Sequence, residues 1–183
     1  MEYLDIVDEA GLPTGEVVSR DVAHRDGVRH RTAHVWVIRE RNGGYDVLLQ
    51  KRSMEKESFP GLYDTSSAGH IPAGCEPLES ALRELHEELG IDAPPEALRF
   101  AGTFRIHYEE TFHGRPFRDN EVTQVYVYRR PVDIDALTLQ ASEVDEVRWF
   151  GLDEVWAEIQ ASRARFCVST AGLDVLRRYL GKR

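Results

Sequence analysis

One short stretch, Gly69 to Ile91, constrains the fold of this chain more than any other. It reads GHIPAGCEPLESALRELHEELGI, and its second half has the pattern of a helix. Pro77 suits a first helical position, and Gly90 suits the left-handed residue that ends a helix. Four leucines recur at helical spacing, namely Leu78, Leu82, Leu85 and Leu89. This stripe predicts that one face of the helix packs on an apolar core.

Three carboxylates gather on a different face of the same helix, at Glu84, Glu87 and Glu88. They lie near the helix C-terminus, where each anion opposes the helix dipole at a cost of about 0.3–1 kcal/mol. Glu84 and Glu88 also repel each other across one turn, by about 0.2–0.5 kcal/mol. A solvated acidic face, relieved in part by a pair between Arg83 and Glu87, would explain this pattern without any function. A divalent cation would also resolve it, because carboxylate oxygens are the ligands of Mg²⁺ in phosphate-transfer chemistry.

The same residues resemble a known motif. Arg83 to Ile91 reads RELHEELGI, and Gly69 lies fourteen residues before Arg83. The pattern resembles the Nudix box, G-x5-E-x7-R-E-U-x-E-E-x-G-U with U aliphatic, and eight of its nine specified positions match. The departure is Cys75, which stands where the box has a supporting glutamate, although Glu76 follows it. The resemblance implies that Arg83 orients three glutamates that hold Mg²⁺, with Mn²⁺ as an alternative: Glu84, Glu87 and Glu88.

Composition and charge narrow the class of protein. With 42% hydrophobic and 30% charged residues, residues 1–183 fit one globular domain with a sizeable core. The net charge of −9 argues against nucleic acid or membrane as a partner, so an anionic small molecule must meet positive charge gathered locally. Cys75 and Cys167 show neither a pairing pattern nor zinc spacing, and no secretory or membrane-spanning pattern is present. We therefore expect a reduced, cytoplasmic setting, and a homodimer remains open.

Alternating apolar residues predict strands on both sides of the central helix. Before it, strands are expected at Tyr3–Val7, Gly15–Ser19, Val35–Ile38 and Tyr45–Gln50. After it, strands are expected at Leu98–Tyr108, Val122–Tyr128 and Val144–Phe150, with a polar loop at Glu109–Asn120. Two helices should follow, near Leu152–Gln160 and Ser169–Leu180. This order predicts an α/β fold, a mixed β-sheet sandwiched between α-helices, which is also the Nudix fold.

Within the Nudix family, the chain is most similar to the type of isopentenyl-diphosphate isomerase and its hydrolase relatives. The similarity lies in the segments Val22–His24, Arg29–His30, Phe59–Gly61, Ser67–His70 and Asp119–Val122. In that branch three histidines and two carboxylates hold a second metal, and the matching positions are His24, His30, His70, Asp119 and Glu121. Imidazole with carboxylate suits Mn²⁺, Zn²⁺ or Mg²⁺, whereas scattered surface histidines would be the plain alternative. The first two histidines are one residue closer together here than in the isomerase.

The same resemblance implies roles for other residues. The positions that grip the diphosphate fall on three basic residues, Arg20, Arg52 and Lys56. The isomerase transfers a proton with a cysteine where this chain has Ala68, and a methyl group cannot do so. Glu121 matches the isomerase's other catalytic group and could act as a general base towards water, with Glu143 and Glu146 as alternatives.

These features predict a Mg²⁺-dependent Nudix hydrolase in which water attacks phosphorus and cleaves a diphosphate linkage. The expected substrate is small, either a prenyl diphosphate or a nucleoside diphosphate derivative. Two other classes stay open. An isopentenyl-diphosphate isomerase is disfavoured by Ala68, and a non-catalytic ligand sensor gains modest support from Cys75.

Overall fold

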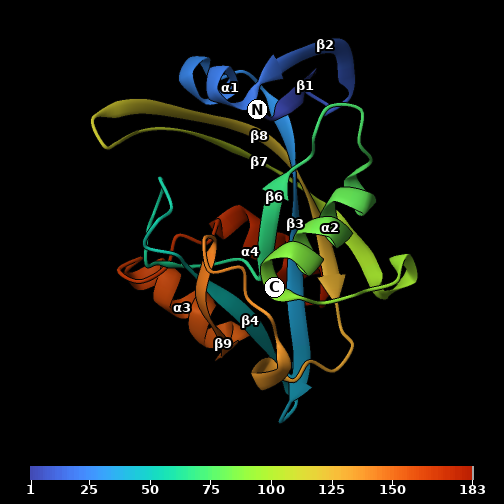
Figure 1. The fold of residues 1–183 in the computed structure, drawn as a ribbon. Helices are drawn as coiled ribbons and strands as arrows, with labels where there is room; N and C mark the ends of the chain where they lie inside the picture. The colour runs from blue at the N-terminus through green and yellow to red at the C-terminus, as the bar shows by residue number, and fades with distance from the viewer. Residues whose placement is uncertain (183) are drawn as a thin grey trace.

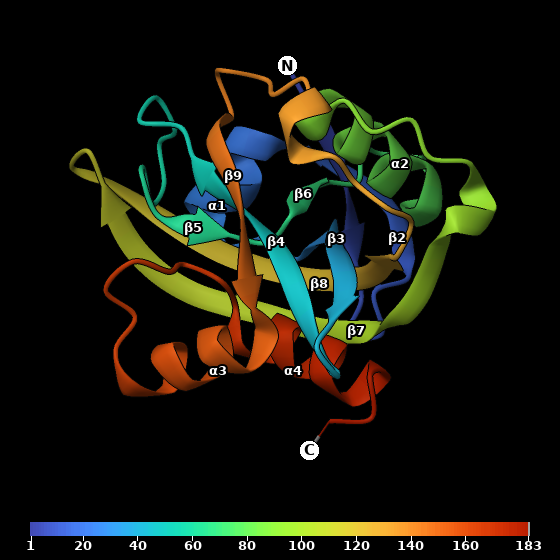
Figure 2. The ribbon, with the colours of Figure 1, turned by 90° about the horizontal axis from the view of Figure 1, so that it is seen from below.

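The structure is a computed structural model that describes residues 1–182. Figures 1 and 2 show how its elements are arranged. The strands are β1 (Tyr3–Val7), β2 (Pro13–Ser19), β3 (His30–Arg41), β4 (Gly44–Arg52), β5 (Tyr63–Asp64), β6 (Ser67–His70), β7 (Leu98–Phe112), β8 (Arg115–Tyr128) and β9 (Val144–Gly151). The α-helices are α1 (Arg20–Asp26), α2 (Pro77–Leu89), α3 (Leu152–Ala161) and α4 (Thr170–Tyr179), and the short 3-10 helices are η1 (Pro95–Ala97) and η2 (Ile134–Ala136).

Strand β3 is the centre of the mixed sheet. On one side it runs parallel to β8, which pairs in turn with β7 in an antiparallel hairpin. On the other side two strands share its length, because β6 pairs with residues 32–35 and β4 pairs with residues 38–41. Strands β5 and β9 then pair with β4. Strands β6 and β4 therefore follow one another along the same edge of β3.

Helices cover both faces of this sheet, as Figure 2 shows with α2 on one side and α3 and α4 on the other. Successive side chains of β3 point to opposite faces of the sheet, so the strand contributes to both cores. Trp36 and Ile38 belong to the core beneath α3 and α4, whereas Val35 and Val37 pack in the core beneath α2. All four side chains are buried, as expected for a central strand covered on both faces.

Helix α2 forms as the sequence predicts. Pro77 occupies its first turn, and Gly90 ends it with φ of 68°, in the left-handed region. Leu85 and Leu89 are fully buried, and the two earlier leucines of the stripe pack at the edge of the same core. The predicted strands and the two C-terminal helices are present as well, although β3, β7 and β8 extend well beyond the predicted ranges and α4 is one residue shorter at each end.

The polar loop predicted at Glu109–Asn120 is wrong. Strands β7 and β8 continue through this segment as a long two-stranded arm, which projects beyond the sheet in Figures 1 and 2. A two-residue turn joins them at His113 and Gly114, with φ of 51° and 75°. Positive φ at both positions matches the twist of the flanking strands in a hairpin. The segment is therefore a strand pair, although its polar composition suggested a loop.

Two further features complete the fold. Residues 20–26 form helix α1, for which the sequence analysis made no prediction. It packs on β8 beside the β1–β2 hairpin at one end of the sheet (Figure 1). Among the described residues, no helix has the length and apolar character needed to cross a membrane.

Candidate active site

A cavity of about 920 Å³ receives side chains from β3, β6, β7, β8, α1, α2 and the loop after β4. Most of the predicted site residues line it: Arg20, His24, Arg52, Lys56, His70, Glu84, Glu87, Glu88, Asp119, Glu121 and Glu143. Three others do not line it, namely His30, Arg83 and Glu146. Segments that are far apart in sequence therefore contribute side chains to one cavity.

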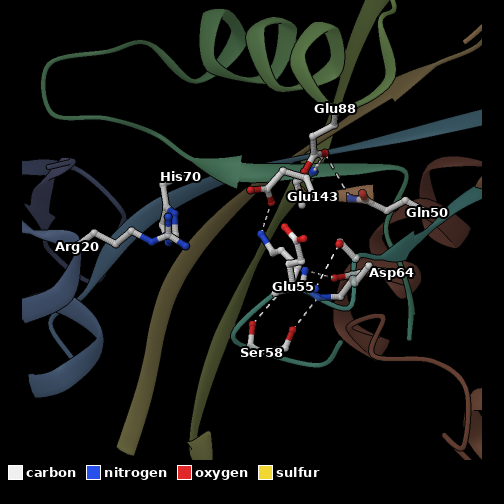
Figure 3. Close-up of polar contacts among 12 residues, drawn as sticks. Arg20, Gln50, Glu55, Ser58, Asp64, His70, Glu88 and Glu143 are labelled. Atoms are coloured by element: carbon white, nitrogen blue, oxygen red, sulfur yellow. Dashed lines mark hydrogen bonds and ion pairs between the residues drawn. The ribbon is translucent and has the colours of Figure 1, made fainter. Parts of the chain in front are cut away.

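Glu88 points from α2 into the gap between β4 and β6, and Figure 3 shows it beside Gln50. Its carboxylate accepts hydrogen bonds from Gln50 Nε2 at 3.3 Å and from the backbone N–H of Ala68 at 3.1 Å. The residue is only 5% exposed. Burial, with a smaller contribution from the nearby charge of Glu84, raises the pKa of Glu88 to about 8. The positive charge of Lys56 offsets this rise in pKa only in part.

Arg83 holds the neighbouring glutamates in place. Its guanidinium donates to Glu84 Oε1 at 2.6 Å and to the carbonyl of His70 at 3.3 Å. It also lies 3.8 Å from Glu87 Oε2, so the pair expected from the sequence is present. Burial raises the pKa of Glu84 despite this contact. Arg83, which lies outside the cavity lining, therefore constrains the orientation of Glu84 and Glu87.

The glycine that begins the motif has a direct steric role. A Cβ atom at Gly69 would lie 2.2 Å from Cδ of Glu84, well inside van der Waals contact. Glu84 can thus cross β6 only because position 69 carries no side chain. Glu84, Glu87 and Glu88 (the helix set) offer the oxygen ligands that Mg²⁺ prefers, and burial already disfavours the ionised form of two of them. The helix set therefore supplies ligands of the right kind for a divalent cation, although among the described residues only members of the strand set bring three ligand atoms within 4.8 Å of one another.

The second predicted ligand set assembles through strand register. His30 lies opposite Glu121 in the parallel β3–β8 pair, and Thr32 lies opposite His70 in the β3–β6 pair. Alternate residues of a strand share a face, so these side chains and Asp119 point to the same side of the sheet. Helix α1 adds His24. We call His24, His30, His70, Asp119 and Glu121 the strand set.

The strand set is compact and buried. His24 Nε2 lies 3.1 Å from His70 Nε2, His24 Nδ1 lies 3.7 Å from Asp119 Oδ1, and His30 Nε2 lies 3.7 Å from Glu121 Oε1. In the two overlapping groups, His24–His30–His70 and His30–Asp119–Glu121, ligand atoms lie within 4.8 Å of one another. Within the described chain, His24 Nδ1, His30 Nε2 and Asp119 Oδ1 are buried without a hydrogen-bond partner. Unpartnered buried ligand atoms of this kind fit a bound cation.

Electrostatics supports the same interpretation. Burial lowers the pKa of His24 to about 4 and that of His70 well below its usual value, so both imidazoles are neutral. Neutral imidazole is the form that ligates metals. Burial, together with the adjacent charge of Glu121, raises the pKa of Asp119 to about 9. The strand set therefore combines neutral imidazoles with one carboxylate that needs a cation to stay ionised, Asp119, whereas, although burial opposes this, contact with His30 lowers the pKa of Glu121.

The three predicted diphosphate-binding residues line the cavity, and each already contacts an acidic side chain. Arg20 lies 3.6 Å from Glu2 Oε2, and Arg52 donates to Asp64 Oδ2 at 3.1 Å. Lys56 forms an ion pair with Glu143, and Figure 3 shows Glu143 between Glu88 and the loop after β4. Of the two alternative bases, Glu143 thus faces the cavity, whereas Glu146 lies outside it and accepts a hydrogen bond from the Tyr63 hydroxyl.

Sequence reasoning missed residues that support the ligands. Thr32 Oγ1 donates to Glu121 Oε2 at 2.9 Å, and Gln50 donates to Glu88 as described above. His34 is buried, lines the cavity and lies opposite Ala68 across the β3–β6 pair. Polar residues at positions 30, 32 and 34, which share one face of a strand, were the available signal.

Comparison with known proteins identifies the family. A family model described as the NUDIX domain matches residues 28–168. This chain belongs to the Nudix family. The family hydrolyses diphosphate linkages and generally uses divalent metals, which agrees with the compact strand set at this cavity.

Individual relatives agree with this assignment. Nudix hydrolase 3 of Arabidopsis thaliana is 41% identical over 155 residues, which cover 84% of this chain but 20% of that protein, so the match spans one fifth of its length. An isopentenyl-diphosphate Delta-isomerase of Dinoroseobacter shibae is 30% identical over 160 residues, covering 87% of this chain and 83% of that one. A crystal structure from Deinococcus radiodurans superposes with a TM-score of 0.70 at 21% identity, covering 96% of this chain and 98% of that chain. The last similarity concerns the fold alone.

Proposed function

We propose that this Nudix protein is a Mg²⁺-dependent hydrolase of a small diphosphate ester, with prenyl diphosphates as its first candidate substrates. The observation that carries the proposal is the convergence of the helix set, the strand set and three basic residues on one cavity, next to the methyl group of Ala68. This arrangement retains what is needed to bind and activate a diphosphate. It lacks a thiol where the related isomerase transfers its proton.

In this mechanism one group of residues would bind the metal and another would bind the diphosphate. The helix set would hold Mg²⁺, which when bound neutralises phosphate charge and makes water more acidic. Arg20, Arg52 and Lys56 would exchange their present carboxylate contacts for diphosphate oxygens and stabilise the charge that develops on them. Water adds to phosphorus, the bridging P–O bond breaks, and the products are a monophosphate ester and inorganic phosphate.

Glu121 is the proposed general base. Its carboxylate lines the cavity and is fixed by the hydroxyl of Thr32, so it is positioned to accept a proton from water. The strand set would hold a second cation, for which imidazole with carboxylate suits Mn²⁺, Zn²⁺ or Mg²⁺. Glu143 is the alternative base, because it also faces the cavity. We further propose that the protein acts in the cytoplasm on a small molecule, in keeping with its two free cysteines.

The test is incubation of the purified protein and Mg²⁺ with isopentenyl diphosphate, followed by phosphorus NMR and mass spectrometry. We expect isopentenyl monophosphate and inorganic phosphate. Dimethylallyl diphosphate as the main product would establish the isomerase instead, a function favoured by the 30% identical relative of that name. Absence of any reaction, alongside rapid turnover of nucleoside diphosphate derivatives, would keep the hydrolase and discard the prenyl substrate. Binding without turnover of either class would favour a ligand sensor.

A further inference from the structure

Four aromatic side chains form a closed cluster at the cavity, and we call them the aromatic wall: Phe59, Tyr108, Phe112 and Phe117. Phe59 comes from the loop of residues 53–62, and the others come from the β7–β8 arm, which lies beside this loop in Figures 1 and 2. Ring centroids are 5.1 Å apart for Phe59–Phe112, 5.5 Å for Phe112–Phe117, 6.2 Å for Tyr108–Phe117 and 6.1 Å for Phe59–Tyr108. Each ring therefore touches two others.

The aromatic wall adjoins the ligands. Phe117 stacks on His24 with centroids 4.3 Å apart and an interplanar angle of 16°, and Tyr108 pairs with Asp119 in the β7–β8 register. Phe59, Tyr108 and Phe117 line the cavity, whereas Phe112 lies outside its lining and joins Phe59 to Phe117. All four are only partly buried. Apolar surface thus begins at the strand set and continues outward along the arm.

The loop that carries Phe59 also carries a proposed diphosphate ligand. Lys56 lies three residues earlier, and Arg52 holds the loop by donating to the carbonyl of Ser58 at 3.0 Å. Phe59 itself has φ of 50°, a left-handed conformation that is uncommon for a bulky side chain. Such a conformation persists only where the surroundings enforce it, and here it turns the ring onto the arm. The loop therefore presents a cation and an aromatic ring to the same cavity.

We infer that the aromatic wall is the subsite for the hydrocarbon group of the substrate and selects diphosphates of hydrophobic alcohols. This inference rests on the proposed function and deepens it. Burial of hydrocarbon against the rings is favourable, while recognition of a nucleobase edge requires hydrogen-bonding groups. Among the four rings, only Tyr108 carries a polar atom. Because the rings continue from Phe117 to Phe59, a ten-carbon geranyl chain gains more contact than a five-carbon group.

The experiment compares kcat/KM for geranyl and dimethylallyl diphosphate in four proteins: the wild type, Phe59→Asn, Phe59→Leu and Phe100→Ala. Asn tolerates the left-handed backbone but removes the ring, whereas Leu retains apolar bulk. Phe100 lies on β7, is 55% exposed and does not line the cavity, so its variant is the matched control. We expect the wild type to prefer geranyl diphosphate, and Phe59→Asn to lower that preference by about tenfold. Phe59→Leu and Phe100→Ala should keep most of it.

Calorimetric binding of a non-hydrolysable geranyl thiolodiphosphate separates this inference from the proposed function. If no prenyl diphosphate is hydrolysed, the prenyl substrate of the proposed function is discarded, yet tighter binding of the geranyl than the dimethylallyl analogue, lost in Phe59→Asn, would still support the subsite. Equal binding or equal turnover of the two chain lengths would overturn it. An equally large effect of Phe59→Asn on adenosine diphosphate would also overturn it and assign the wall to nucleobase stacking.

Discussion

The helix set and the strand set face the same cavity but are built in different ways. The helix set consists of three carboxylates within five positions of one helix, Glu84 to Glu88, and Glu87 remains open to solvent. The strand set gathers five residues from α1, β3, β6 and β8, and four of them are buried. The first depends on local helix geometry, and the second depends on correct pairing of the sheet.

A physical link joins the two sets. Arg83 donates to Glu84 in the helix set and to the backbone carbonyl of His70 in the strand set. Gly69, next to His70, leaves the space that Glu84 occupies. Strand β6 is thus shared, so we expect a disturbance of β6 to affect both sets and a change within one set to leave the other in place. Five predictions on four variants test this division.

The largest effect should come from the helix set. Glu88→Gln keeps the size of the side chain but removes a carboxylate, and we expect kcat to fall about 100-fold or more. Steady-state kinetics in Mg²⁺ would measure it. Glu79→Gln is the matched control, because Glu79 lies on the same helix, is exposed and does not line the cavity. Near-normal turnover in Glu88→Gln would remove the helix set from the mechanism.

Stability of the metal-free protein provides a second measurement on the same variant. The pKa of Glu88 is raised from 4.5 to about 8, so the folded state binds more protons than the unfolded state between these values. The contribution of Glu88 to the free energy of unfolding is therefore present at low pH and is lost as pH rises from about 4.5 to 8. We expect urea denaturation of Glu88→Gln to show a smaller loss over this range and slightly greater stability at neutral pH.

The strand set should control metal content. His24→Gln removes one imidazole, and we expect the protein to lose one bound Mn²⁺ per chain after dialysis, with affinity lowered by about tenfold or more. Elemental analysis by mass spectrometry gives the stoichiometry. His107→Gln on β7 serves as the control, since His107 is exposed and outside the strand set. If His24→Gln kept the wild-type metal content, the strand set would not be a metal site.

Strand β6 gives a smaller effect that reaches both sets. In Gly69→Ala the new Cβ must displace Glu84, so we expect kcat to fall about tenfold and metal binding at both sets to weaken. Gly44→Ala is the control, because its Cβ would meet only Arg41 O at an ordinary 3.6 Å. Wild-type kinetics in Gly69→Ala would mean that Glu84 has no fixed role in the site.

Cys75→Glu should have the smallest effect. It restores the box residue at a position that lies outside the cavity lining, where Cys75 packs at the edge of the core beneath α2. We expect kcat to stay unchanged or to rise, as measured in the same assay. A large loss of activity, with the folded state intact by circular dichroism, would reveal a role for the thiol.

Much of this structure could be predicted from the sequence because it depends on local interactions. Helix α2, its caps, its leucine stripe and its carboxylate face all follow from contacts between residues three or four positions apart. For the same reason the two C-terminal helices appear where the sequence predicts them. The Nudix motif also indicated the family, because all of its positions lie within one short stretch of sequence.

Tertiary structure decided what depends on contacts between distant segments. The β7–β8 arm contradicted the polar loop because cross-strand pairing, which composition does not reveal, outweighed the polar character of residues 109–120. Burial of the strand set, the support of Glu88 by Gln50 and the docking of Phe59 on the arm likewise join residues from 38 to 95 positions apart. Strand register and the docking of α1, α2 and the loop of residues 53–62 bring such residues together. A shift of the register by one residue would turn each strand side chain to the opposite face.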